Sequence, residues 1–252
     1  MKSIFHNPDN QQINFLDKRY YTKDNVNYYP SVTTVLEALP KGWALEQWKK
    51  DLGHNADLVL ERAAKEGSNV HDAIESYLGG AEVRWQDEKT GNSYNLTEWT
   101  SILRFVDFWE TYQPELIANE MNIISDTYRL GGTIDIVCRI AGQLWLIDAK
   151  TSNSIYDSME LQLSAYATMW NEVAPEKIER TGILHLKAQT RGADKTGKKI
   201  QGLGWQLKEF DRHYSQAWQS FQLLRGVWDE CNPDYKPANL TLPDRVKLKR
   251  TA

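Results

Sequence analysis

The chain has 252 residues, of which 41% are hydrophobic and 25% are charged, a composition typical of one large globular domain or two small ones rather than of a fibrous or disordered protein. Its 30 lysines and arginines against 34 aspartates and glutamates give a formal net charge of −4, which excludes binding of nucleic acid by overall positive charge, because phosphate binding depends on Lys and Arg. The two cysteines, Cys138 and Cys231, are too few for a disulfide framework or for a four-thiolate zinc or iron–sulfur site.

The first third of the chain predicts a hairpin followed by helices. Aromatic, β-prone residues at 20–22 and 26–29 flank a polar turn, and Pro30 is expected to end the hairpin. Ser31 is a good N-cap for a short helix that ends before Pro40. Further helices are predicted over residues 43–50, 56–65, about 69–78 and around 102–109, with an interruption at residues 67–68 and a stop at Gly79 and Gly80.

The rest of the chain changes to a mixture of strands and helices. Strands are predicted over residues 115–124, 132–140, 144–150 and 178–188, with residues 200–210 pairing with the last of them, and helices over 157–173 and around 221–228. This order predicts an α/β or α+β fold with a small central mixed sheet flanked by helices and a helical N-terminal portion. We expect a single domain in which residues 1–112 form the hairpin and helices, 113–230 the sheet and its helices, and 231–252 a basic tail.

Three ionisable residues lie in two neighbouring predicted strands. Asp135 interrupts an apolar run, and Asp148 and Lys150 lie two apart at the end of the next strand. Since side chains alternate across a strand, Asp148 and Lys150 share a face, and Asp135 can join them if the strands pair. Two carboxylates and an ammonium on one face are costly to bury unless they are partners or hold a cation. The alternative is a solvated Asp–Lys pair on an exposed edge, which needs no function.

Three other residues do not indicate a functional site when each is considered alone. His71 shares a helix face with Ile74 and therefore points into the protein, where a lone histidine is more often structural than a ligand. Gln162 and Tyr166 lie one helical turn apart soon after Lys150, and by themselves they are an ordinary amphipathic pair.

The order and spacing of these residues resemble a known enzyme family. The motifs are similar to the full series of the PD-(D/E)XK nucleases of the RecB-like exonuclease group: His71 on a helix that starts at a glycine, Glu120, Gly132 with Asp135, Asp148-Ala149-Lys150, and Gln162 with Tyr166. Within that group, residues 31–36, 44–49, 67–75 and 148–152 resemble the mitochondrial genome maintenance exonucleases. The resemblance implies the PD-(D/E)XK restriction-endonuclease-like core as the fold.

The resemblance also implies a metal site. Asp135 and Asp148 would bind Mg²⁺ or Mn²⁺ together with His71 and the backbone carbonyl of Ala149. The metal would polarise the scissile phosphate and lower the pKa of a bound water. Lys150 would orient or deprotonate that water, provided that burial and the metal depress the pKa of the lysine.

Further roles follow from the same resemblance. Glu120 would be an outer acidic residue that helps a second metal or a metal-bound water. Gln162 and Tyr166 would position the nucleic-acid backbone or the lysine. Iron–sulfur members of the superfamily carry four cysteines, so no such cluster is expected in a chain with two, and the absence of a P-loop predicts no nucleotide cofactor.

Several residues are candidates for DNA contacts. Ser31, Thr33 and Thr34 at a helix start could bind a phosphate, or they could form an ordinary N-cap. Trp43 and Trp85 could stack on unpaired bases. Residues 187–199 hold five basic residues against one acidic residue, a local charge of +4 that includes Arg191, Lys195, Lys198 and Lys199, and residues 241–252 hold four against one, a local +3.

The sequence thus predicts a metal-dependent DNA exonuclease that prefers single-stranded DNA or free ends and acts in replication, recombination or repair, with recombination or replication proteins as partners. The alternatives are a structure-selective or double-strand endonuclease and a non-catalytic DNA-binding subunit of the same fold, against which the intact Asp135, Asp148 and Lys150 argue. With neither an apolar segment of membrane-spanning length nor a targeting peptide, we expect a bacterial or phage protein of the cytoplasm, without membrane contact.

Overall fold

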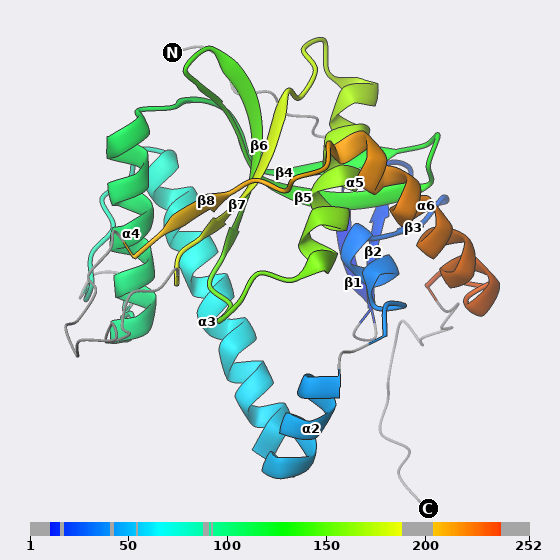
Figure 1. Ribbon diagram of the computed structural model, residues 1–252, viewed down its shortest axis with the longest axis horizontal. Coiled ribbons are helices and arrows are strands. Elements are labelled where there is room, and N and C mark those ends of the chain that lie inside the picture. Colours follow the sequence, from blue (N-terminus) through cyan, green and yellow to red (C-terminus); the bar gives the residue numbers. More distant parts are fainter. Residues whose placement is uncertain are drawn as a thin grey trace, which may run out of the picture.

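The computed structural model describes residues 11–15, 18–40, 43–53, 55–87, 91, 93–187 and 204–237. Its centre is a five-stranded sheet in the order β4–β5–β6–β7–β8 (Figure 1). All neighbouring strands are antiparallel except β6 and β7, which are parallel. The predicted mixed sheet is therefore confirmed, with these strands: β4 (Glu115–Ser125), β5 (Leu130–Ile140), β6 (Gln143–Lys150), β7 (Arg180–His185) and β8 (Gln206–Lys208).

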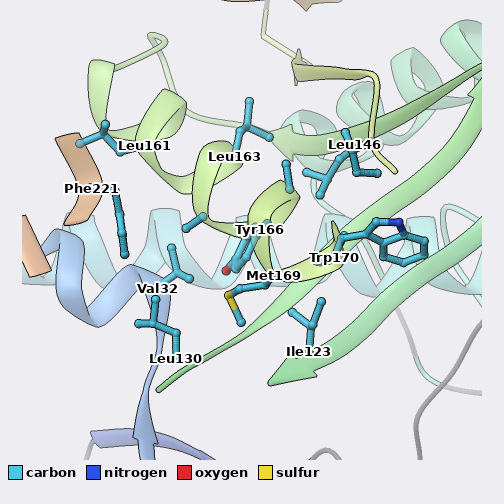
Figure 2. Packing of buried hydrophobic residues seen from close by; sticks show 14 of the residues in the cluster. Val32, Ile123, Leu130, Leu146, Leu161, Leu163, Tyr166, Met169, Trp170 and Phe221 are labelled. Atoms are coloured by element: carbon cyan, nitrogen blue, oxygen red, sulfur yellow. The ribbon is translucent and has the colours of Figure 1, made fainter. Parts of the chain in front are cut away.

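Helices cover both faces of this sheet. On one face, α5 (Asp157–Val173), which connects β6 to β7, packs with α1 (Val32–Leu36) and α6 (Tyr214–Cys231) in one apolar cluster. Figure 2 shows Leu163, Tyr166 and Trp170 of α5 within this cluster. On the other face, α3 (Asn55–Leu78) and α4 (Leu96–Tyr112) supply a second cluster. The remaining helix, α2 (Trp43–Leu52), lies at the end of α3 that is distant from the sheet (Figure 1).

The sequences of β5 and β6 are nearly continuous apolar runs because helices cover both faces of these strands. The residues of β6 from Leu144 to Ala149 are all buried, and those of the adjacent β5 are mostly so. The turn between the two strands has positive φ at both Ala141 and Gly142, 49° and 86°, which is the backbone conformation that a two-residue hairpin turn requires. The sequence Ala141-Gly142-Gln143 predicts a tight antiparallel connection here, and the pairing of β5 with β6 confirms it.

The predicted N-terminal hairpin is confirmed in its pairing but not in its limits. A second sheet contains β1 (Gln11–Phe15), which the sequence reading did not anticipate, and β2 (Lys18–Thr22) and β3 (Tyr29–Pro30). As predicted, Pro30 ends the hairpin, since it is the last residue of β3, where it pairs with Tyr20. Residues 26–27 lie in the turn rather than in a strand, since the N–H groups of both donate to the Asp24 carboxylate.

The predicted interruption at residues 67–68 is wrong. One helix, α3, runs without a break from Asn55 to Leu78. A glycine inside a helix costs only about 1 kcal/mol, and the buried Val70, Ala73 and Ile74 on the same helix pack against the sheet and offset this cost. The predicted stop is confirmed, because α3 ends at Leu78 and Gly80 has a φ of 85°.

Both cysteines are free, Cys138 buried in β5 and Cys231 exposed at the end of α6. Burial raises the pKa of the Cys138 thiol to about 12, so this side chain is unreactive at neutral pH. Among the described residues, no helix has both the length and the apolar character that crossing a membrane requires.

Candidate active site

The pairing of β5 with β6 brings the two aspartates together. The last regular pair joins Ile136 to Ile147, which places Asp135 and Asp148 opposite each other at the next position. The N–H of Ala149 donates a hydrogen bond of 2.9 Å to Asp135 Oδ2. This hydrogen bond holds the Asp135 carboxylate beside Ala149, whose carbonyl stays a predicted metal ligand.

Asp148 is almost fully buried, with 1% of its surface exposed. Its Oδ1 accepts a hydrogen bond of 2.9 Å from Gln162 Nε2 of α5. Its Oδ2 lies 2.7 Å from Lys150 Nζ, but no well-aligned hydrogen bond reaches this oxygen from the described residues. Burial raises the pKa of Asp148 to about 6, against the opposing effect of the Lys150 charge.

A second group of side chains adjoins this pair. His71 Nδ1 lies 3.3 Å from Glu120 Oε1 and 3.6 Å from Asp135 Oδ2. Each of the three residues offers one ligand atom, and these atoms all lie within 4.8 Å of one another. One helix and two strands thus meet here, since His71 comes from α3, Glu120 from β4 and Asp135 from β5.

Glu120 has an unusual backbone. Its φ is 43°, in the left-handed region that a residue with a side chain rarely adopts within a strand. On either side of it, Ala118 and Met121 are three residues apart and yet belong to the same apolar cluster, and so do Ile134 and Val137 on the paired strand. The alternation of faces therefore breaks on both strands at the level of Glu120, and strain of this kind is concentrated at functional sites.

The charges of the site perturb one another. Burial lowers the pKa of His71, but the carboxylates of Asp135 and Glu120 outweigh burial and raise it to about 9. Burial also lowers the pKa of Lys150, yet Asp148 and Asp135 outweigh it and raise that pKa above its ordinary value. The predicted role of Lys150 as a base requires that burial and the bound metal together depress its pKa. Without the metal, the two carboxylates stabilise the ammonium form instead.

Tyr166 lies close to the strand of Asp135 because the residue that it packs against is a glycine. A Cβ added to Gly132 would lie 2.3 Å from Tyr166 Cε1, so only glycine allows the ring to contact the strand this closely. Burial raises the pKa of Tyr166 well above its ordinary value, so its hydroxyl is neutral. On α5, Gln162 therefore contacts Asp148, and Tyr166, one turn later, packs on the strand that carries Asp135.

The sequence reading missed Tyr21. This buried side chain of β2 fills the space above Gly131, where an added Cβ would lie 2.2 Å from Tyr21 Cβ. Its hydroxyl lies 3.0 Å from Thr133 Oγ1, two residues before Asp135. The consecutive glycines 131 and 132 inside a strand were the available signal, because glycines there often mark the close approach of another group.

The remaining predicted residues lie elsewhere. Ser31 is the N-cap of α1 and accepts a hydrogen bond from the Thr34 N–H, while Thr33 and Thr34 both lie within hydrogen-bond distance of its hydroxyl. Trp85 is about half exposed and stacks on Trp99. The Trp43 side chain, Arg191, Lys195, Lys198, Lys199 and the tail beyond residue 237 lie outside the described residues.

Comparison with protein families matches residues 29–236 to the PD-(D/E)XK nuclease superfamily. The chain belongs to this superfamily. No curated protein matches it. The superfamily assignment covers the second sheet's last strand, the whole central sheet and every described helix, so the sequence-based expectation of this family and fold is confirmed.

The site fits the divalent cation that PD-(D/E)XK nucleases use. A histidine and two carboxylates converge at His71, Glu120 and Asp135, and Asp148 holds a buried oxygen without a well-aligned hydrogen bond. Carboxylate oxygens suit Mg²⁺ and Mn²⁺, and an added imidazole is more usual for Mn²⁺ than for Mg²⁺. The cluster shares His71 and Asp135 with the predicted ligand set, and it contains Glu120, which was predicted as an outer acidic residue, but neither Asp148 nor Ala149.

Proposed function

We propose that the protein is a divalent-metal-dependent deoxyribonuclease that acts as an exonuclease on single-stranded DNA or free ends, in replication, recombination or repair. The observation that carries the proposal is the convergence of His71, Glu120 and Asp135 beside the buried Asp148–Lys150 pair. The preference for ends and single strands rests on the resemblance of the motif series to the RecB-like exonucleases.

Each side chain has a role that its surroundings support. His71, Glu120, Asp135 and Asp148 would hold the cation, which would supply the charge that polarises the scissile phosphate and acidifies a water molecule. Lys150 is held as an ammonium by Asp148. It would orient the attacking water and stabilise the developing negative charge, because its raised pKa makes it a poor base in the metal-free protein.

Gln162 and Tyr166 are positioning residues. The Gln162 amide fixes one oxygen of Asp148, which leaves the other oxygen directed at Lys150 and available to a cation. Tyr166 packs on Gly132 and keeps water from the base of the site. Both act through Asp148 and the strand rather than through the substrate.

The test uses oligonucleotides labelled at one end or the other, single-stranded and double-stranded, with Mg²⁺, Mn²⁺ or EDTA. We expect a ladder of products that starts at one end of the single strand, that requires a metal and that stops in EDTA. Closed circular single-stranded DNA should remain intact, since an exonuclease needs an end.

Two other outcomes would support an endonuclease or a non-catalytic DNA-binding subunit instead. Cleavage of the closed circle, or of internal sites in a duplex, would indicate an endonuclease. DNA binding without cleavage under any metal, combined with no metal binding in a calorimetric titration, would indicate a non-catalytic subunit.

A further inference from the structure

A polar groove lies beside the N-terminal sheet, outside the metal cluster. It has a volume of about 780 Å³ and lies between β1 and β2, the start of α1 and the end of α6. Two exposed cations, Lys18 and Arg19, line it on one side, and the hydroxyls of Thr33 and Thr34 on another. Trp228 and Tyr235 supply an aromatic wall.

Neither cation forms an ion pair with a carboxylate among the described residues. Lys18 Nζ lies 5.6 Å from the centre of the Tyr235 ring, and the Tyr235 hydroxyl donates to the backbone carbonyl of Arg19 at 2.9 Å. The only acidic residue that lines the described groove is Glu37. The groove therefore carries a net positive charge on a protein whose formal net charge is −4.

Tyr21 lies between Arg19, which lines the groove, and the strand that carries Asp135. The Arg19 guanidinium and the Glu120 carboxylate both act on the Tyr21 hydroxyl, one lowering and the other raising its pKa, while burial is the largest influence and raises it. Tyr21 contacts Thr133, and Thr133 donates to Asn122 at 2.8 Å. Thr133 and Asn122 are two residues from Asp135 and Glu120, about 7 Å along their strands.

We propose that this groove binds the sugar–phosphate backbone of the DNA strand whose scissile phosphate lies at the metal cluster. Lys18 and Arg19 neutralise phosphate charge, and one of the hydroxyls of Thr33 and Thr34 donates a hydrogen bond to a phosphate oxygen, while the other remains bonded to Ser31. This inference rests on the proposed nuclease function and extends it. Since the groove offers charge and hydroxyl groups but its aromatic rings already pack on one another, the contact is with the backbone and is independent of base sequence.

The experiment measures binding of a fluorescent single-stranded oligonucleotide in EDTA, where no cleavage occurs, over a series of KCl concentrations. Lys18→Ala and Arg19→Ala are each expected to weaken binding on the order of tenfold at low salt. Each should also reduce the slope of log affinity against log salt by about 0.7, the value for one phosphate contact on a single strand.

Glu37→Gln is the most decisive variant of the experiment, because it should increase the affinity for the oligonucleotide. It removes the negative charge of the groove, and a gain in affinity cannot arise from partial unfolding. Lys23→Ala is the matched control on the same hairpin, since Lys23 pairs with Asp126 at 2.7 Å and does not line the groove. Its affinity and salt slope should equal those of the wild type.

The outcomes separate this proposal from the proposed function. Wild-type protein that binds and cleaves DNA, together with unchanged affinity and salt slope in Lys18→Ala and Arg19→Ala, would overturn the groove assignment alone. Weaker binding or no change in Glu37→Gln would also overturn it. Failure of the wild type to cleave with any metal would refute the nuclease proposal, whereas binding that depends on the groove residues would still support the groove.

Discussion

Asp148 and Lys150 show how burial and charge compete at single residues of the site. Burial alone would make both side chains neutral, since it raises the pKa of an acid and lowers that of an amine. Their separation of 2.7 Å keeps the lysine protonated, while the pKa of Asp148 still rises to about 6. The buried pair therefore carries a cost in the folded protein, which is consistent with a functional rather than a stabilising role.

The first prediction concerns this pair. Asp148→Asn and Lys150→Met should each lower the rate of metal-dependent cleavage by at least about a hundredfold, because charge placed at the reacting centre contributes on that scale. The amide oxygen of the introduced asparagine could still accept the hydrogen bond from Gln162, so circular dichroism and DNA binding in EDTA should stay close to wild type. Glu82→Gln, which removes an exposed ion pair with Arg84, serves as the control. Full cleavage by either site variant would contradict the assignment.

The raised pKa of His71 predicts that the stability of the metal-free protein depends on pH. Its pKa rises from 6.5 to about 9 despite burial, because of Asp135 and Glu120. A raised folded-state pKa contributes stability that is complete below pH 6.5 and is lost as the pH rises through about 9. In EDTA, the thermal midpoint of the wild type should therefore approach that of His71→Gln between these pH values. A difference in midpoint that stays constant over this range would show that the imidazole does not gain a proton in the folded state.

At the scale of elements, two glycines near the site differ in whether the packing of a helix requires them. Gly132 lets α5 place Tyr166 on β5, with no room for a Cβ. Gly67 lies on α3, one turn before His71, where an added Cβ would meet Thr151 Oγ1 at 3.5 Å, an ordinary contact distance. One glycine is therefore required by packing, and the other is not.

Because only Gly132 is required by packing, alanine substitutions at the two glycines should change the free energy of unfolding in opposite directions. Gly132→Ala should destabilise the protein by about 1–3 kcal/mol, since the Tyr166 ring must move, and it should also reduce cleavage. Gly67→Ala should stabilise it by about 0.5–1 kcal/mol through helix propensity. Urea denaturation measures both free energies of unfolding. Equal effects of the two substitutions would contradict the packing argument.

At the scale of the whole molecule, the site joins parts of the chain that are far apart in sequence. Residue 71 of α3, residue 120 of β4 and residues 135–150 of the β5–β6 hairpin supply the charged groups, and α5 supports them from the other face. A cation held by these groups would connect α3 to the sheet. Ligands that bind only the folded state stabilise it by mass action.

Metal binding should consequently raise global stability. We expect the thermal midpoint of the wild type to increase with Mn²⁺ concentration, by an amount equivalent to about 2.7 kcal/mol at a hundredfold excess over the dissociation constant. Asp135→Asn should abolish most of this increase, because it removes a charged ligand while keeping the shape of the side chain. Equal Mn²⁺ stabilisation of the variant would place the metal elsewhere.

Local sequence features predicted most of the elements. The apolar runs of β5 and β6, the turn at Ala141 and Gly142, and the helical spacing in α4 and α5 depend on short-range preferences that the chain carries in any context. Asp148 and Lys150 were identified in the same way, since strand alternation places them on one face. The helix interruption at Gly67 was predicted wrongly. Glycine lowers helix propensity locally, whereas the packing of α3 against the sheet, which outweighs this effect, involves residues far away in the sequence.

The sequence by itself determined the superfamily, the succession of the central strands along the chain, and the motif with Asp135, Asp148 and Lys150, because these follow from residue types and their spacing. Only the tertiary structure decided that Glu120 contacts His71, that one oxygen of Asp148 is buried without a well-aligned hydrogen bond, that Lys150 has a raised pKa, and that Arg19 lies near Tyr21. Each of these depends on burial and on distances between residues far apart in the chain, and both arise only when the two faces of the sheet are packed.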